Sequence, residues 1–211
     1  MRTAAGCGRF FCMKTSIAQL AVSPDVALAT MRSAGALMHG HFQLSSGLHS
    51  PEYFQCAKLL EQPAVAARIS LAMAPVCHEW RPDVVVSPAL GGMLFGYELA
   101  RTLGVRNMFA ERPTGAFELR RGFELKPGER VLLAENVVTT GGSVSEVARL
   151  VAELGAEVVG YAVIVDRGSG RFAPSEPMVA FASADVRVFE PEKCPLCAAG
   201  QELTKPGSRK N

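Results

Sequence analysis

The sequence has no apolar run approaching the roughly 20 residues that a membrane-spanning helix requires, and no large excess of either charge. Its 22 Lys and Arg residues against 20 Asp and Glu leave a net charge of +2, which argues against nucleic acid or an anionic membrane surface as the main partner. Internal repeats and low-complexity tracts are also absent. With 48% hydrophobic and 20% charged residues in a chain of 211, the composition predicts an ordinary soluble globular protein with a sizeable core.

Cysteines are scattered along the chain. The six are Cys7, Cys12, Cys56, Cys77, Cys194 and Cys197, and the last two are the one close pair. This usage predicts reduced thiols in a cytoplasmic protein rather than a disulfide framework. The N-terminal stretch MRTAAGCGRFFCMK is too short and too broken in its apolar content for a secretory signal. We therefore predict that residues 1–12 form a disordered extension and that Met13 is the true start.

The first 80 residues predict helices around a hairpin. Residues 16–38 have a helical period interrupted at Ser23-Pro24, where a Ser cap followed by Pro can begin a second helix. Residues 39–60 alternate short apolar patches with Gly, Ser and Pro, which indicates a strand or hairpin with turns. An Ala-rich helix is predicted over 62–79, beginning near Pro63.

Beyond residue 80 the sequence repeats the order strand, loop, helix. The predicted strands are 83–87, 106–111, 130–134, 157–165 and 178–186, the loops are 88–92 and 135–141, and the helices are 92–103 and 142–154. Continuous apolar runs such as VVV and YAVIV are typical of strands that are covered on both faces, and helical crossovers imply parallel pairing. The predicted fold class is therefore α/β, with an open, mainly parallel sheet flanked by helices.

The stretch LLAENVVTTGGSVSEV (132–147) ends a buried strand in an unusual loop. The loop residues that lead into the next helix are Thr139, Thr140, Gly141, Gly142 and Ser143. Glycines permit a close backbone approach, free N–H groups face outward, and the helix dipole favours negative charge. The loop is predicted to bind a phosphate monoester, while the lack of a Gly-Lys-Ser/Thr motif argues against nucleoside triphosphate hydrolysis. The alternative is a Gly-rich turn with a Ser/Thr cap and no ligand.

Two further loops follow predicted strands, at the carboxyl ends where open parallel sheets bind ligands. The loop SPALGG can present backbone amides to a second anion. Its candidate residues are Ala89, Leu90, Gly91 and Gly92. The loop DRGSG places Arg167 at a strand end, where its guanidinium can pair with a carboxylate or phosphate. The alternatives are a tight turn that needs Gly and a solvated surface Arg.

The segment ERPTGAFELRRGFELKPGER (111–130) is rich in cations, Gly and Pro. One interpretation is a solvated hairpin. The other is a mobile basic flap that closes over a polyanion and excludes water. Its candidate cations are Arg112, Arg120, Arg121 and Lys126.

Together these segments resemble the type I phosphoribosyltransferases, and within them the orotate phosphoribosyltransferases. The general signature is an apolar strand, two acids, two apolar residues and Thr-Gly or a close variant, which corresponds to 132–141 here. The narrower resemblance lies in GHFQLSSGLHSPEYFQCAKLL, SPALGGMLFGYELAR, ERPTGAFELRRGF and VDRGSG, and it covers about 40–205. The predicted division is an extension (1–12), helices and a hood segment (13–60), the α/β core (61–190) and a Cys-x-x-Cys tail (191–211).

The resemblance implies a reaction and a role for each loop. Orotate would displace diphosphate from Mg²⁺-bound phosphoribosyl pyrophosphate, giving orotidine 5′-monophosphate for pyrimidine synthesis. The 139–143 loop would hold the 5′-phosphate, and 88–92 would hold the diphosphate. Arg167 would pair with orotate, while Tyr53 and Phe54 would line the base pocket. Mg²⁺ would be bound mainly through the substrate, and the protein would be a homodimer whose flap reaches the neighbouring active site.

The sequence departs from this family at a position implied to be catalytic. Most relatives have two acids, which hold the ribose hydroxyls, where this chain has Glu135 and Asn136. Asn keeps one acceptor oxygen but loses the charge. Many orotate enzymes also carry Lys where Ser45 stands. Two alternatives stay open: a weakened paralogue that binds phosphoribosyl pyrophosphate or a nucleotide as a regulatory module, and a transferase for another base. Thr139 stands where the hypoxanthine-guanine enzymes carry Asp, which argues against that specificity.

The pair CPLC (194–197) has the spacing of half a zinc knuckle. A closed site needs two more ligands, and the sequence has no second Cys-x-x-Cys. Cys56, Cys77 or a second subunit are the candidate donors. A structural or solvated role is assigned to the histidines His39, His41 and His49. We therefore assign no metal-ligating residue from the sequence.

Overall fold

The computed structural model describes residues 19–44, 46–168, 171–184 and 187–206. The extension predicted over 1–12, the start predicted at Met13 and the candidate residue Ser45 lie outside these residues. Within the described ranges, no helix combines the length and the apolar character needed to cross a membrane.

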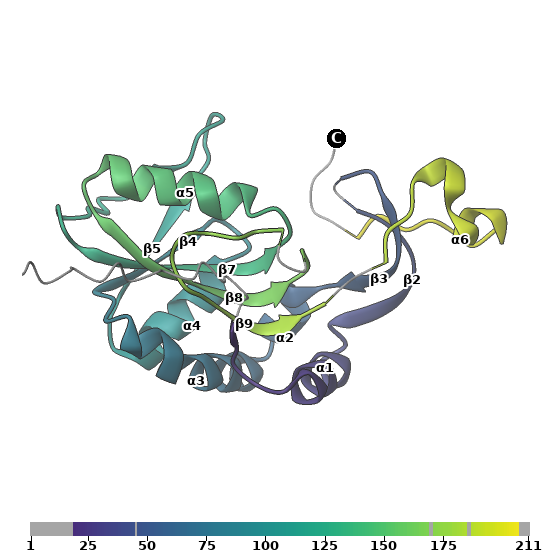
Figure 1. The fold of residues 1–211 in the computed structure, drawn as a ribbon, viewed down its shortest axis with the longest axis horizontal. Coiled ribbons are helices and arrows are strands. Elements are labelled where there is room, and N and C mark those ends of the chain that lie inside the picture. The colour runs from purple at the N-terminus through teal and green to yellow at the C-terminus, as the bar shows by residue number, and fades with distance from the viewer. Residues whose placement is uncertain (1–18, 45, 169–170, 185–186, 207–211) are drawn as a thin grey trace, which may run out of the picture.

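A seven-stranded sheet forms the centre of the molecule (Figure 1). Its order is β1-β9-β8-β7-β4-β5-β6, and all neighbouring pairs are parallel except β5 and β6. The strands are β1 (Gln19–Leu20), β4 (Val84–Pro88), β5 (Arg106–Glu111), β6 (Glu118–Leu119), β7 (Arg130–Val138), β8 (Glu157–Asp166) and β9 (Met178–Ser183). The predicted open, mainly parallel sheet is confirmed.

Helices cover both faces of this sheet, as Figure 1 shows. The helices in the described part of the chain are α1 (Pro24–Ser33), α2 (Cys56–Leu60), α3 (Pro63–Glu79), α4 (Met93–Leu103), α5 (Gly142–Glu153) and α6 (Pro195–Ala198), with a short 3-10 turn, η1 (Pro191–Lys193). Alternate strand residues face opposite sides, so Val85 and Leu132 pack with α3 and α4, whereas Val86 and Leu133 pack with α5. Burial on both faces explains why β4 and β8 are continuous apolar runs.

A separate antiparallel hairpin stands beside the main sheet. It consists of β2 (Leu37–Gln43) and β3 (His49–Phe54). The chain after β9 returns over this hairpin, where Phe189 pairs with His49 and Thr204 pairs with Phe42. In Figure 1 the tail with α6, drawn in yellow, lies next to β2 and β3. The hairpin and the C-terminal tail, far apart in sequence, therefore form one unit.

The structure corrects the prediction in four places. Residues 56–60, which were included in the predicted hairpin segment, form helix α2, because a helical turn buries Cys56, Leu59 and Leu60 in the core. Gln19–Leu20, within the stretch predicted as helix, form β1, because the edge of β9 offers backbone partners that override the local period. Strand β7 does not end at 134 but continues to Val138, because its backbone stays paired with β8. Strand β9 ends at Ser183 rather than at 186. The second helix predicted at Ser23-Pro24 is confirmed as α1, and its cap Ser23 accepts from the backbone N–H of Val26.

Candidate active site

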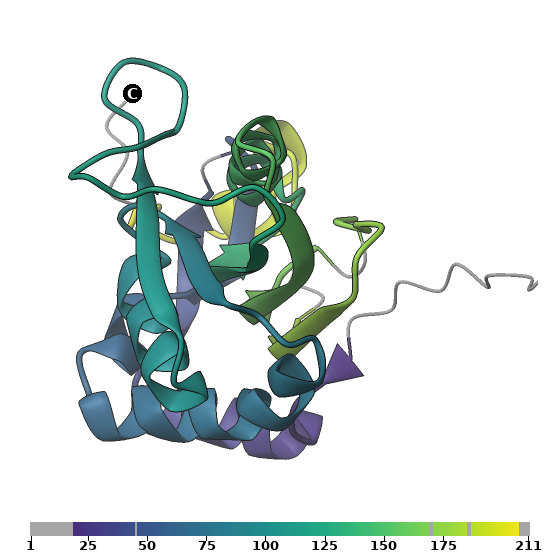
Figure 2. The same ribbon diagram turned by 90° about the vertical axis from the view of Figure 1, so that its left-hand side faces the viewer.

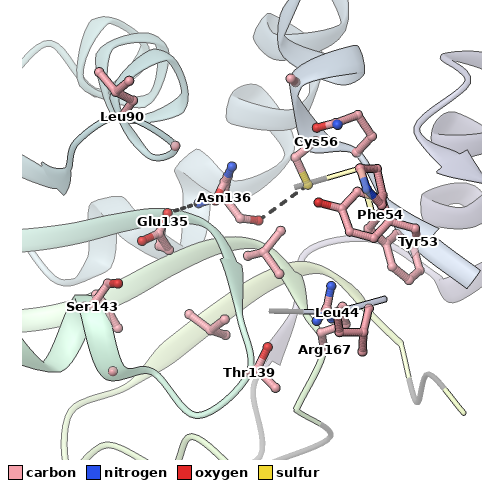
Figure 3. A pocket seen from close by; sticks show the side chains of 18 of the residues that line it. Leu44, Tyr53, Phe54, Cys56, Leu90, Glu135, Asn136, Thr139, Ser143 and Arg167 are labelled. Atoms are coloured by element: carbon pink, nitrogen blue, oxygen red, sulfur yellow. Dashed lines mark hydrogen bonds between the residues drawn. The ribbon is translucent and has the colours of Figure 1, made fainter. Parts of the chain in front are cut away.

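A cavity of about 960 Å³ opens between the carboxyl ends of β7 and β8 and the β2–β3 hairpin. Most of the candidate residues named from the sequence line it: Tyr53, Phe54, Leu90, Gly91, Glu135, Asn136, Thr139, Thr140, Gly141, Gly142, Ser143 and Arg167. Figure 3 shows the acid–amide pair in the middle, Thr139 and Ser143 on one side, and Tyr53 and Phe54 on the other. The tertiary structure therefore brings the predicted phosphate loop and the predicted base-binding residues into one pocket.

The predicted phosphate loop, residues 139–143, joins β7 to the N-terminus of α5. Gly141 has a φ of +73°, and a Cβ at this position would lie 2.0 Å from the Phe172 ring, so the turn requires glycine. The first N–H groups of α5 have no partner within the helix, and its first turn carries no acidic residue. These groups and the Thr139, Thr140 and Ser143 hydroxyls give the cavity wall hydrogen-bond donors of the kind that suit an anion.

The loop after β4 packs directly against β7. A Cβ on Gly91 would lie 3.0 Å from the side-chain amide of Asn136, and one on Gly92 would lie 2.8 Å from the Ala134 carbonyl oxygen. The Ala89 N–H donates to the Ala110 carbonyl at 2.8 Å, so it is not available to a ligand. Leu90 and Gly91 line the cavity, whereas the other two predicted residues of this loop, Ala89 and Gly92, are outside the lining.

Glu135 and Asn136 lie in strand β7, not in the loop predicted over 135–141. The Glu135 side chain is 8% exposed, and its Oε1 accepts a 2.8 Å hydrogen bond from the backbone N–H of Asn136 (Figure 3). Burial raises the pKa of Glu135 to about 7, against the opposing effect of that hydrogen bond. A carboxyl that titrates near neutrality in a cavity is a feature of functional sites.

Arg167 follows β8 and faces the hairpin across the cavity. Its backbone N–H donates to the Val138 carbonyl at 2.8 Å, which fixes the start of the loop. Burial lowers the pKa of the Arg167 guanidinium, while the nearby Tyr53 and Cys56 raise it. Burial raises the pKa of Tyr53, and the charge of Arg167 opposes that shift. A half-buried cation beside an aromatic hydroxyl suits a flat ligand that carries a carboxylate.

Comparison with known proteins identifies the family. Residues 55–192 match the phosphoribosyl transferase domain. The chain is 50% identical over 171 residues to an orotate phosphoribosyltransferase of Caldanaerobacter subterraneus subsp. tengcongensis, covering 81% of this chain and 90% of the relative. It is 46% identical over 189 residues to that of Caldicellulosiruptor bescii, covering 90% of this chain and all of the relative. The chain belongs to the orotate phosphoribosyltransferase family.

A solved structure supports the assignment. The orotate phosphoribosyltransferase of Mycobacterium tuberculosis H37Rv, crystallised with inorganic phosphate, superposes with a TM-score of 0.60 and 25% identity, covering 76% of this chain and 96% of that chain. As a phosphoribosyltransferase, the protein is a glycosyltransferase that acts on a pentosyl group.

The predicted flap of this phosphoribosyltransferase projects from the body of the molecule (Figure 2). None of the residues 111–130, all described, lines the cavity. Arg112 pairs with Glu146 and stacks 4.2 Å above the Phe117 ring, and Arg121 pairs with Glu111 at 2.8 Å. The remaining two candidate cations, Arg120 and Lys126, are exposed. Within one chain, therefore, the four predicted flap cations and the cavity are not brought together.

The cavity of this orotate phosphoribosyltransferase family member is also lined by residues that were not assigned to it from the sequence, among them Gln55, Cys56, Leu94 and Lys205. Cys56 is 2% exposed and its thiol donates to the Asn136 carbonyl at 3.7 Å. Burial raises the pKa of Cys56 to about 12, with Glu135 adding to the shift, so the thiol is neutral. Cys56 comes two residues after Phe54, the last residue of β3, and this closeness in the chain was its one available signal. Lys205 comes from the tail, and no local pattern indicates it.

Substitution of Gly141 by Ala is expected to lower the free energy of unfolding by about 2–4 kcal/mol, because the added methyl meets the Phe172 ring and the backbone has a positive φ. Urea denaturation followed by circular dichroism measures the change. Gly142→Ala is the matched control, since no atom lies within 4 Å of a Cβ there, and its effect is expected within about 0.5 kcal/mol. Equal effects of the two substitutions would contradict this account of the loop.

Proposed function

We propose that this enzyme transfers the phosphoribosyl group from Mg²⁺-bound phosphoribosyl pyrophosphate to orotate, giving orotidine 5′-monophosphate and diphosphate. The observation that carries the proposal is that the 139–143 loop, Glu135 and Arg167 line one cavity. The names of the curated relatives support the choice of orotate as the base. Nothing in the proposal requires a nucleophilic side chain, and the neutral, buried Cys56 thiol is unsuited to that role.

Each charged group of the substrates has chemically suited residues in the cavity wall. The N-terminus of α5 and its hydroxyls would receive the 5′-phosphate, where the helix dipole and free N–H groups favour a dianion. The backbone at Leu90 and Gly91 would receive the diphosphate, next to the Asn136 amide. Arg167 would pair with the orotate carboxylate beside Tyr53. The anomeric carbon would then lie near the acid–amide pair between the two groups.

Catalysis would consist of positioning and charge stabilisation. As the bond to diphosphate breaks, positive charge develops on the ribose ring, and an ionised Glu135 close to it lowers the energy of that state. Asn136 provides an acceptor oxygen but no charge. The cations of the flap would cover the departing diphosphate and exclude water once the flap closes.

The residues present fit a magnesium ion that is held mainly by the substrate. Among the described residues that line the cavity, Glu135 is the one carboxylate, fewer than a Mg²⁺ site made of protein ligands alone requires. Mg²⁺ commonly keeps several waters and binds phosphate oxygens in such sites. When bound, the ion would neutralise charge on the leaving diphosphate.

We propose a C₂ homodimer as the functional unit. Leu90, Leu94 and Tyr97 at the start of α4 are 83%, 62% and 61% exposed, and a group of large apolar side chains of this kind is typical of an interface. Leu90 and Leu94 also line the cavity, so a partner docked there would lie beside the pocket. A cytoplasmic location is supported by the cysteines in the described part of the chain, none of which is in a disulfide.

The purified protein is expected to consume orotate in the presence of phosphoribosyl pyrophosphate and Mg²⁺, measured as the loss of orotate absorbance. Arg167→Met is expected to raise the KM for orotate about 10–100-fold, because a charge-assisted pair is lost, with little change in the KM for phosphoribosyl pyrophosphate. Arg171→Met is the matched control, an exposed arginine a few residues further along the chain.

Two other outcomes would replace the proposal. Saturable binding of phosphoribosyl pyrophosphate without turnover would indicate the regulatory paralogue. Turnover with adenine, guanine or hypoxanthine but not with orotate would indicate a transferase for another base.

A further inference from the structure

We propose that His41, His49, Cys194 and Cys197 bind a zinc ion that fastens the C-terminal tail to the β2–β3 hairpin. Each side chain offers one ligand atom, and these four atoms all lie within 4.8 Å of one another. Two come from adjacent strands of the hairpin, and two come from the turn around α6, more than 140 residues later. Such a convergence of two imidazoles and two thiols is the donor set of a structural zinc site.

The distances between the ligand atoms fit one tetrahedral ion. The Cys197 Sγ lies 3.3 Å from His49 Nδ1 and 3.6 Å from His41 Nε2, and the Cys194 Sγ lies 3.5 Å from His41 Nε2. Zn–S bonds of about 2.3 Å and Zn–N bonds of about 2.0 Å at tetrahedral angles give S-to-N distances of about 3.5 Å. A two-iron cluster would hold the cysteine pair and the histidine pair on different irons, further apart than this.

The surroundings prepare His41 to act as a ligand. Its Nδ1 lies 2.9 Å from the Gln201 carbonyl oxygen. A carbonyl oxygen only accepts, so Nδ1 carries the hydrogen and Nε2 presents its lone pair to the cluster. A backbone carbonyl that orients a histidine in this way is typical of metal sites. The other ligand nitrogen, His49 Nδ1, is 2.9 Å from His41 Nε2.

The site is closed and separate from the active site. His41, His49 and Cys194 are 3–4% exposed, and four protein ligands leave no open position for a substrate. Among the described residues that line the active-site cavity, none of these four is found. Neither Cys56 nor Cys77, the donors considered from the sequence, belongs to the cluster in the described part of the chain. The ion would therefore hold structure rather than take part in catalysis.

The metal would reinforce a junction that backbone hydrogen bonds already form. Phe189 and His49 exchange two such bonds at 2.8 and 2.9 Å, and Thr204 donates to the His41 carbonyl at 2.8 Å. Phe189 and Thr204 flank the Cys194–Cys197 pair in the chain. Lys205, the next residue after Thr204, lines the active-site cavity. Fastening the tail would thus fix one edge of the pocket.

The first test measures metal in the full-length protein as purified from zinc-supplemented cells. Elemental analysis is expected to find about one zinc per chain, in keeping with one set of four ligands. Stripped wild-type protein titrated with Co²⁺ is expected to show the visible ligand-field bands of a tetrahedral ion and a thiolate-to-metal charge-transfer band in the near ultraviolet. Protein free of metal that also fails to take up Zn²⁺ or Co²⁺ in stoichiometric amounts would overturn the proposal.

Matched variants locate the ion. Cys194→Ser and His41→Gln are expected to lose the bound zinc, whereas Cys77→Ala and His39→Gln are expected to keep it, because Cys77 and His39 lie outside the cluster. Retention of zinc by Cys194→Ser and His41→Gln would overturn the assignment. If either of these variants fails to fold, the titration of stripped wild-type protein still decides the question.

Hydrogen exchange tests the fastening role. Removal of zinc by a chelator is expected to speed the exchange of the Phe189 and Thr204 N–H groups at least about tenfold, since their hydrogen bonds lie across the junction. Strand β7 serves as the internal reference, with no change expected. Unchanged protection at both positions after complete loss of zinc would refute the fastening role.

Discussion

Asn136→Asp is expected to raise kcat about a hundredfold. A carboxylate about 5 Å from a developing unit charge contributes roughly 3 kcal/mol at an effective dielectric constant near 20, and a gain of that size corresponds to about two orders of magnitude in rate. Asn136 lines the cavity next to Glu135 and lies against Gly91 of the proposed diphosphate loop, so the new charge would face the reacting ribose. Initial rates at saturating orotate and phosphoribosyl pyrophosphate measure the effect.

The increase in kcat caused by Asn136→Asp is also expected to depend on pH. Glu135 already titrates at about 7 because it is buried, and a second carboxylate beside it would raise its pKa further. The gain from Asn136→Asp is therefore expected to increase with pH above neutrality. Gln55→Glu is the control, because it adds the same charge to the wall of the same cavity but outside strand β7. An unchanged rate in Asn136→Asp, or an equal rise in Gln55→Glu, would refute the role given to position 136.

Glu135→Gln is expected to stabilise the ligand-free protein by about 3 kcal/mol at pH 8 and by about 1 kcal/mol or less at pH 5. Folding raises the pKa of Glu135 from 4.5 to about 7, so the folded state favours the protonated form. Its contribution to stability is full below pH 4.5 and is lost as the pH rises through 7. Gln resembles the protonated acid in shape and does not ionise. Urea denaturation at the two pH values measures the difference.

The same substitution is expected to lower kcat about a hundredfold, because the charge that faces the ribose is removed. Glu153→Gln, at an exposed position on α5, is the control and is expected to change neither quantity. An equal stability gain at pH 5 and pH 8 would show that ionisation of Glu135 does not destabilise the folded state. Retained activity would contradict its catalytic role.

Local patterns in the sequence were sufficient for most of the architecture. Apolar runs around Val85 and Val163 predicted buried parallel strands, and α3, α4, β5 and α5 lie within a residue or two of their predicted bounds. The Thr-Thr-Gly-Gly-Ser loop was recognisable because a strand-to-helix turn brings its own glycines and hydroxyls together within five residues. Gln19–Leu20 followed a helical period but became a strand, because the partner that decides their conformation, β9, is about 160 residues away.

The proposed zinc ligands also show that local patterns cannot indicate which distant segments meet. The spacing of Cys194 and Cys197 suggested half a site, and His41 and His49, which flank the hairpin turn, carried the other half. Nothing within either segment indicates that they meet, because the contact depends on the tail crossing the hairpin at Phe189 and Thr204.

The sequence by itself determined the fold class, which follows from periodicity, and the family, which follows from a resemblance of motifs over about 40–205. It also predicted the phosphate loop from residues adjacent in the chain. The tertiary structure alone decided that Glu135 is buried enough to titrate near neutrality, that Lys205 reaches the pocket, and that four distant ligand atoms converge. The physical reason is that desolvation and metal geometry depend on which segments pack together, and packing joins segments that share no local pattern.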